Sequence, residues 1–423
     1  MKKHSYDNFG ELFYTETLAN GLQVILWHKP DHVNSAFFLA TPFGALTLKE
    51  KVKEKEYVFH SGIAHFLEHK VFESGDHHDV MEDFSRMGAQ VNAFTSYTET
   101  CYYFSTPNKE IAEPLNMLLD FVQGFSCDEK SVKKEKGIII QEYLMYLQMP
   151  DVRLGMELLK ALYHKIPINK DISGDEKNIK AISKAELELA HSINYHPANM
   201  VLIGVSAIAP HKLIKIIKDN QAAKDFLPLN KAEKITEAEP EEVVNAFQEI
   251  KMGLSQPKIA LGYKLPLYPG TRQEIATADI LFRLWLTAYF SSLNPDYQKW
   301  LDDKIINDSF SCEGMITEDF AVLMISGDDL GKDFIKTFDD YLNSLLSKPF
   351  SAKILKQLKK RYIGKTLQNL NSADSIAINT MHYGWKDRRY LDMVEVLNDI
   401  SLADITKLQK FLTWEQKSVI RII

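Results

Sequence analysis

A polar interruption near the midpoint is the feature that most constrains how this sequence can fold. Between Gln221 and Glu242 the chain is rich in Lys, Glu and Ala, contains two prolines and lacks sustained apolar periodicity, which is typical of a linker. The chain has 423 residues, of which 45% are hydrophobic, so each side of the interruption can bury a core of its own. We therefore predict an N-terminal domain at residues 1–225, a linker at 226–243 and a C-terminal domain at 244–423.

Charge and composition exclude several classes of protein. The formal net charge of -7 argues against a nucleic-acid partner, which would favour a basic surface. No segment has the ~20 consecutive apolar residues of a transmembrane helix, and Met1 to Gly10 shows no secretory signal. The three cysteines are scattered and odd in number, which indicates free thiols rather than a disulfide framework. We expect a cytoplasmic protein.

The order of periodic segments predicts an α+β protein. An Asn-Gly turn within Thr17–Trp27 predicts a hairpin, Lys49–Glu56 is expected to be an exposed connection, and Ser61 is expected to cap a helix that extends to Phe72. The second half repeats the style of the first. The remaining strands are predicted at Val33–Ala40, Val91–Thr106, Met200–Val205, Lys258–Tyr263 and Ala321–Ser326, and the remaining helices at Glu110–Phe125, Glu129–Met149 (closed by Pro150), Ala276–Phe290 and Ile354–Asn369.

The segment His65-Phe66-Leu67-Glu68-His69 carries the strongest chemical signal. Helical residues three and four apart share a face, so His65, Glu68 and His69 are expected to point the same way. Two imidazoles spaced in this way can bind one zinc ion, and the glutamate between them can act on a water molecule at that ion. The motif is H-x-x-E-H, the inverse of the commoner H-E-x-x-H.

A catalytic zinc site needs a third protein ligand and one open position. Glu135 and Glu142 are seven residues apart on a predicted helix, so they share a face, and either could bind the metal while the other supports it. His77-His78 is interpreted as a solvated pair, His196 as structural and Glu129 as a helix-start charge. The same ligands would also accept manganese or cobalt.

Four segments together resemble the pitrilysin-type (insulinase) family of zinc peptidases, known as M16. They are His65–His69, Asn92–Ser96 (NAFTS), Glu135–Glu142 (EKGIIIQE) and Tyr195–Met200 (YHPANM). The resemblance implies that Glu142 is the third zinc ligand and that Glu135 is a supporting catalytic-site carboxylate. It also implies two homologous α/β-roll domains, each a mainly antiparallel sheet with helices packed on it. Asn92, Ala93, Phe94 and Thr95 would form a sheet edge to which the substrate peptide adds as a strand.

One departure from this family concerns the C-terminal half. Members that are catalytically complete usually carry an arginine and a tyrosine there, which bind the substrate carbonyl. The corresponding stretches here, Phe310–Ile316 and Phe320–Asp328, contain neither residue type. Arg361-Tyr362 and Arg389-Tyr390 are expected on helices, as structural or surface pairs. We therefore hypothesise that a motif-less sister subunit supplies the pair, with a homodimer as the other option.

The resemblance implies a Zn2+-dependent endopeptidase, the catalytic subunit of a heterodimer, similar to short bacterial members carrying segments such as Asp151–Leu154 and Leu370–Ala373. Related branches trim leader peptides from ribosomally made bacteriocins, so leader processing is one expected role. The alternative is a non-catalytic peptide-binding or scaffolding subunit, which the intact motif disfavours. A structural zinc site is also disfavoured, because such sites usually have four protein ligands that commonly include Cys.

Overall fold

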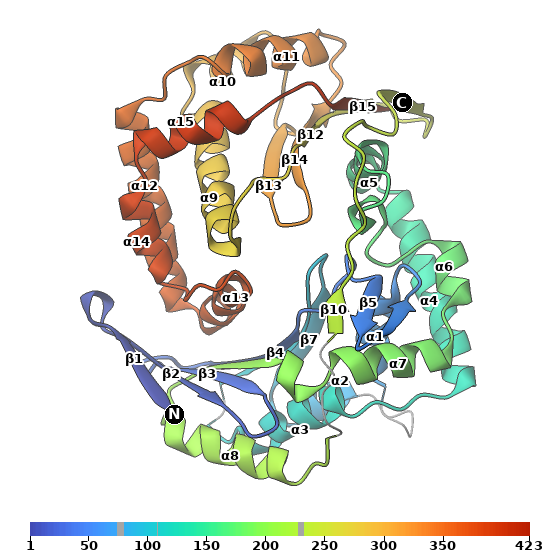
Figure 1. Ribbon diagram of the computed structural model, residues 1–423, viewed down its shortest axis with the longest axis vertical. Helices are drawn as coiled ribbons and strands as arrows, with labels where there is room; N and C mark the ends of the chain where they lie inside the picture. Colours follow the sequence, from blue (N-terminus) through green and yellow to red (C-terminus); the bar gives the residue numbers. More distant parts are fainter. Residues whose placement is uncertain (74–79, 108, 227–231) are drawn as a thin grey trace.

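The computed structural model describes residues 1–73, 80–107, 109–226 and 232–423. The N-terminal β-sheet lies in the lower part of Figure 1 and the C-terminal β-sheet in the upper part, below α10 (Pro295–Asp302) and α11 (Phe334–Leu345). Helices cover the outer face of each sheet and also fill the space between them. The predicted α+β class is confirmed, whereas the residue boundaries of the two predicted domains stay a prediction.

The two large sheets of described strands are a seven-stranded N-terminal sheet and a five-stranded C-terminal sheet. The N-terminal order is β1 (Lys2–Tyr6), β2 (Glu11–Thr17), β3 (Gln23–His28), β9 (Val201–Ser206), β4 (Ser35–Thr41), β8 (Thr100–Thr106) and β7 (Gln90–Thr95). The C-terminal order is β11 (Phe247–Ile250), β15 (Lys417–Ile422), β12 (Lys258–Leu265), β14 (Ala321–Asp328) and β13 (Ser311–Ile316).

The two sheets share one topology. Five neighbouring strands of the N-terminal sheet lie in the order β3-β9-β4-β8-β7, and the C-terminal sheet has the order β11-β15-β12-β14-β13. If the five strands of each set are numbered as they occur along the chain, both orders read first, fifth, second, fourth, third. In both sheets the first and fifth strands are parallel, β3 with β9 and β11 with β15, while the other described pairs are antiparallel. The two halves therefore repeat one fold unit, as the sequence pattern suggested.

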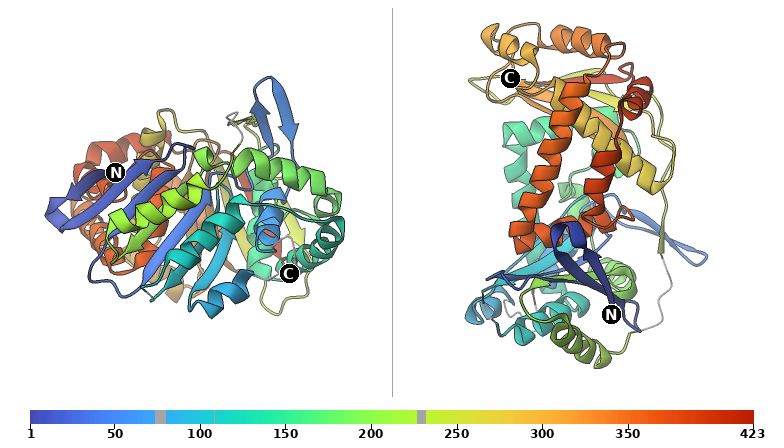
Figure 2. Two further views of the ribbon diagram at one scale, coloured as in Figure 1. Left: turned by 90° about the horizontal axis from the view of Figure 1, so that it is seen from below. Right: turned by 90° about the vertical axis from the view of Figure 1, so that its left-hand side faces the viewer.

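A small third sheet corrects one prediction. The expected exposed connection at Lys49–Glu56 is a hairpin of β5 (Lys49–Val52) and β6 (Lys55–Val58), which projects from the body in both views of Figure 2. Most of its side chains are charged, including Glu50, which is buried against Asn194. The hairpin therefore lacks the apolar alternation that reveals a strand. β10 (Ala232–Lys234), within the predicted linker, pairs with β5, so the described part of this linker is anchored. Residues 227–231 lie outside the described residues.

Helices follow the predicted positions with small shifts at their ends. The helix predicted to run to Met149 ends at Leu147, and Pro150 begins the next helix, because proline fits the first turn of a helix. The described N-terminal helices are α1 (Ile63–Val71), α2 (Val80–Arg86), α3 (Ala112–Gln123), α4 (Glu129–Leu147), α5 (Pro150–Leu162), α6 (Glu176–Ala181), α7 (Lys184–Asn194) and α8 (Pro210–Ala222). The described C-terminal helices are α9 (Arg272–Tyr289), α10 (Pro295–Asp302), α11 (Phe334–Leu345), α12 (Ala352–Gln368), α13 (Ala373–Gly384), α14 (Asp392–Asp399) and α15 (Leu402–Phe411).

Each half donates a helix to the sheet of the other half (Figure 1). The N-terminal helix α5 packs Leu154, Leu158 and Leu162 on the face of the C-terminal sheet that carries Ala260 and Val322. In return, α13 lies on the inner face of the N-terminal sheet, against β4 and β9. Because both faces are covered, the whole of β4 is buried.

We expect Leu158→Ala to destabilise the whole protein by about 2–5 kcal/mol, because it leaves a cavity under the donated helix. Leu158 is 1% exposed and lies against Gly262 of the C-terminal sheet. The measurement is urea unfolding, with Leu267→Ala as the control, since Leu267 is 56% exposed. Equal unfolding midpoints for the two variants would show that this contact does not stabilise the fold.

Candidate metal centre

The helix that carries the H-x-x-E-H motif begins at a glycine. Gly62 is the N-cap of α1, with a φ of 92°, and a Cβ there would lie 2.3 Å from the Ser173 carbonyl oxygen. Only glycine accommodates both constraints readily. The predicted cap at Ser61 is therefore wrong, since the chain enters the helix in a left-handed conformation without a side-chain cap.

The face of α1 that carries Ile63, Phe66 and Leu67 is buried in the N-terminal core. This packing leaves His65, Glu68 and His69 on the other side, where α4 and β7 approach. The shared face predicted from the spacing is thus present. Glu142, on α4 near its C-terminal end, completes a cluster with the two histidines.

The ligand atoms of His65, His69 and Glu142 all lie within 4.8 Å of one another. A Glu142 carboxylate oxygen is 3.7 Å from His65 Nε2 and 3.5 Å from His69 Nε2. These separations are long for hydrogen bonds, but they approach the about 3.3 Å between two ligand atoms of a tetrahedral zinc ion. The donor set fits zinc, and it leaves a fourth position for a reactant.

Glu135 orients one of these histidines. Its Oε1 lies 2.9 Å from His69 Nδ1, which directs Nε2 toward Glu142, the arrangement typical of zinc-binding histidines. Burial acts to lower the pKa of His69, but the hydrogen bond and charge of Glu135, with Glu68 and Glu142, raise it overall. Burial likewise opposes ionisation of Glu135, yet the bond to His69 holds the Glu135 pKa below its usual value.

His65 is kept neutral, the form in which imidazole binds a metal. Burial and the nearby charge of His69 lower its pKa to about 3. Its Nδ1 is buried and finds no hydrogen-bond partner among the described residues. A buried polar atom of this kind is unusual away from functional sites.

Glu68 is beside the cluster without belonging to it. Burial raises the pKa of its carboxyl group, and the Thr95 hydroxyl donates a 2.6 Å hydrogen bond to its Oε2. The other oxygen is then available to accept a proton from a reactant. Sequence reasoning did not foresee this bond, because no periodicity links the two residues.

The four residues predicted to bind substrate lie on β7, the edge strand of the N-terminal sheet. Asn92 Oδ1 accepts a 2.8 Å hydrogen bond from the Ala93 amide, and the Phe94 ring packs near Tyr103. Thr95 is the last residue of the strand, and its hydroxyl is hydrogen-bonded to Glu68. The strand edge predicted to bind substrate and the motif helix therefore adjoin.

The other residues singled out from the sequence have structural surroundings. His196 Nδ1 accepts from the Ala198 amide and caps a short 3-10 helix, and Glu129 lies in the first turn of α4. His77 and His78 lie outside the described residues.

The two arginine–tyrosine pairs do not approach the metal centre through any described contact. Tyr362, on α12, makes a 3.0 Å hydrogen bond with Thr287. Tyr390 donates to the Thr366 carbonyl. The expected helical position of Arg389-Tyr390 is wrong: the pair follows the end of α13 and precedes α14.

The C-terminal half has apolar packing at the place that the metal cluster occupies in the N-terminal half. α9 lies on the edge strand β13 as α1 lies on β7. A Cβ at Gly314 of β13 would lie 2.4 Å from the Phe282 ring and 2.8 Å from Leu286 Cδ1. Within the described part of the chain, no second group of potential metal ligands occurs.

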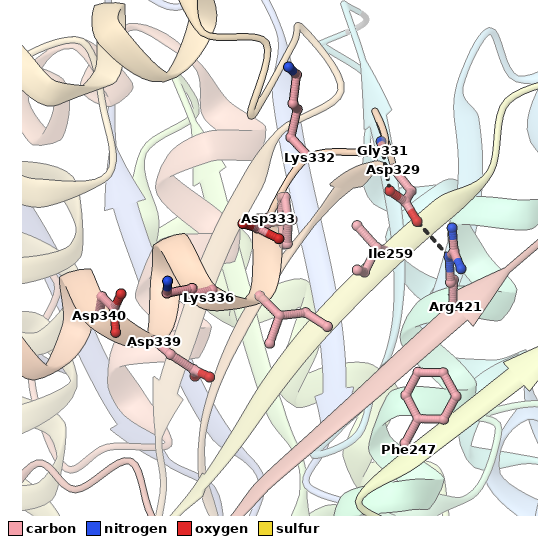
Figure 3. A pocket seen from close by; sticks show the side chains of 12 residues that line it. Phe247, Ile259, Asp329, Gly331, Lys332, Asp333, Lys336, Asp339, Asp340 and Arg421 are labelled. Carbon is pink, nitrogen blue, oxygen red and sulfur yellow. Dashed lines mark hydrogen bonds and ion pairs between the residues drawn. The ribbon is translucent and has the colours of Figure 1, made fainter.

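Two cavities lie elsewhere. One of about 520 Å³ is bordered by β11, β15 and the start of α11, and Figure 3 shows Phe247, Asp329 and Arg421 among its charged and apolar lining. Another of about 380 Å³ is lined by residues such as Tyr143 and Asp171. None of the three cluster residues lines either cavity.

Two family models match the chain. The model described as insulinase (peptidase family M16) matches residues 53–176, and the model described as peptidase M16 inactive domain matches residues 181–362. The chain is 32% identical to a Bacillus subtilis protein named as an uncharacterized zinc protease, YmfH, covering 100% of this chain and 99% of that protein. It is also 27% identical to the mitochondrial-processing peptidase subunit beta of Saccharomyces cerevisiae, over 48% of this chain and 42% of that protein.

Solved structures show the same fold. A putative M16-like peptidase from Alicyclobacillus acidocaldarius superposes with a TM-score of 0.92 at 29% identity, with 98% of each chain covered. A protease from Helicobacter pylori superposes with a TM-score of 0.81 at 19% identity, covering 97% of this chain and 99% of that one. The described helices include none with the length and hydropathy of a membrane span.

We expect Glu135→Gln to weaken zinc binding by about 10- to 100-fold, because the amide cannot replace the charged acceptor of the His69 Nδ1 proton. Competition with a chromophoric chelator measures the affinity. Glu129→Gln, on the first turn of the same helix, is the matched control and should bind zinc like the wild type. Unchanged affinity in Glu135→Gln would contradict its supporting role.

Proposed function

Since this chain belongs to the insulinase family of peptidases (M16), we propose that it is a zinc-dependent endopeptidase. The observation that carries the proposal is the cluster of His65, His69 and Glu142 with Glu68 beside it. A structural site would be expected to offer four protein ligands, whereas this cluster offers three. The three described cysteines are free and are not part of it.

In this proposal His65, His69 and Glu142 hold the ion, and Glu135 fixes the ring of His69. A bound zinc ion would supply Lewis-acid activation of water and of the scissile carbonyl. Glu68 takes a proton from the attacking water and returns it to the leaving amine. Burial raises the pKa of Glu68, which makes its carboxylate a stronger proton acceptor than a solvated one.

The substrate would be a peptide in extended conformation that adds to β7. The Ala93 amide donates a hydrogen bond to the Asn92 side chain. A carbonyl of the substrate would replace Asn92 Oδ1 as the acceptor of this amide. Asn92 would then be free to contact the substrate. Pairing to a strand edge selects for backbone shape rather than for side chains, which suits a peptidase of leader or signal segments.

A second subunit would complete the site. β13 and β14, where the family's arginine and tyrosine are expected, contain neither. We propose that a motif-less sister subunit supplies them, with a second copy of this chain as the other source. The specific role that we propose is the processing of bacteriocin leader peptides in the cytoplasm. The three free thiols would persist in that compartment.

Glu68→Gln should retain zinc and lose hydrolysis by about 10²–10⁴-fold, because only the proton transfer is removed. His65→Ala should lose both. The measurement combines metal analysis with cleavage of a quenched fluorescent peptide library. Full cleavage by the Glu68→Gln variant would rule out the assigned base.

Cleavage should appear, or rise strongly, when the protein is mixed with a motif-less sister subunit from the same genome. The partner restores the carbonyl-binding groups that β13 and β14 lack. A full rate in the protein alone, as a monomer by light scattering, would contradict the two-subunit site. Absence of zinc together with absence of cleavage in every mixture would favour a peptide-binding or scaffolding subunit instead.

A further inference from the structure

The turn between β7 and β8, residues Ser96–Glu99, contains a buried carboxylate that the proposed reaction does not use. Glu99 is 4% exposed. It accepts hydrogen bonds from Ser96 Oγ at 2.7 Å and from Thr98 Oγ1 at 2.5 Å, and the Ser96 amide donates to the Glu99 carbonyl at 2.8 Å. A buried carboxylate is costly unless it is paired, so the turn is organised around this side chain.

A histidine from the other half of the molecule completes the pairing. His382, on α13, places Nε2 3.5 Å from Glu99 Oε1. Burial opposes ionisation of Glu99, but the bonds from His382, Thr98 and Ser96 together lower its pKa. The negative charge therefore persists inside the turn and attracts the imidazole of the donated helix.

The same turn is fixed on its other sides. The Ala45 and Leu46 amides donate to the carbonyls of Ser96 and Tyr97, at 3.0 and 2.9 Å. A Cβ at Gly44 would lie 2.6 Å from the Glu99 amide nitrogen, so the two segments are in the closest possible contact. Leu46 and Tyr97 also pack in the core beneath α5. The turn thus contacts α13 through Glu99 and the core under α5 through Tyr97.

This turn directly follows the residue that hydrogen-bonds the proposed catalytic base, Glu68. Thr95 immediately precedes Ser96, and its hydroxyl holds Glu68 at 2.6 Å. Thr95 is also opposite Thr100, which is anchored to the Phe43 carbonyl. Any rotation of the turn would therefore move the hydroxyl that orients Glu68 and the strand edge to which a peptide would add.

We infer that His382 and Glu99 are positioning residues of the peptidase site. The contact between His382 Nε2 and Glu99 holds the β7–β8 turn against α13. The turn holds Thr95 on Glu68 and keeps β7 in line for the substrate. The inference rests on the proposed peptidase function for its catalytic part, and on the fold alone for its structural part.

The test compares His382→Ala with His382→Gln, which keeps an N–H donor. His382 is 44% exposed on its side chain, so neither change opens the core. Tyr6→Phe is the matched control, because it removes a 3.1 Å bond between the halves, to Asp392, at the opposite edge of the same sheet. Zinc content, thermal unfolding, kcat, KM and amide hydrogen exchange are measured for all three variants and the wild type, with the sister subunit present for the kinetics.

In His382→Ala we expect about tenfold faster amide exchange around residues 90–100 and about a tenfold lower kcat/KM. Zinc content should be unchanged, and the unfolding midpoint should match that of Tyr6→Phe. His382→Gln should restore both exchange and kcat/KM.

Unchanged exchange in His382→Ala would overturn the inference, whether or not the protein cleaves peptides. Faster exchange with unchanged kcat/KM would equally overturn the positioning role. A wild-type protein that cleaves nothing would refute the proposed function, while the exchange data would still decide whether the His382–Glu99 contact holds the turn.

Discussion

Each sheet of this protein has two apolar faces, and the helices of its own half cover only one of them. The second face is covered by a helix from the other half: α5 on the C-terminal sheet and α13 on the N-terminal sheet. Burial of apolar surface is the dominant favourable term in folding, so neither sheet is complete without the opposite half. The rest of the architecture depends on this exchange of helices.

The exchange also positions the metal centre. α5 follows α4 after Gln148 and Met149, so anchoring α5 in the C-terminal core fixes the helix that bears Glu142. α13 in return carries His382 to the turn next to Thr95. The cluster therefore lies where elements held by both halves meet. In the repeated unit of the other half, Phe282 and Leu286 pack against Gly314. Among the described residues of that unit, no group of potential metal ligands occurs.

Much of this could be predicted from local patterns. The i, i+3, i+4 spacing of His65, Glu68 and His69 and the two-turn spacing of Glu135 and Glu142 are properties of a helix alone, and the structure brings these residues together. The hairpin at β5 and β6 was missed because its side chains are charged on both faces. The Glu68–Thr95 and Glu99–His382 contacts were missed because they join elements whose meeting is decided by tertiary packing, which no periodicity records. The start of α1 depends on a contact of Gly62 with Ser173 that is equally non-local.

In the proposed site, two histidines and one glutamate hold a zinc ion with a position open to reactants. Zinc K-edge X-ray absorption on the zinc-loaded protein tests it most directly. We predict one zinc per chain, with nitrogen and oxygen scatterers at about 2.0–2.2 Å and two of them imidazoles. A sulfur scatterer at about 2.3 Å, or a spectrum unchanged by His69→Ala, would contradict it.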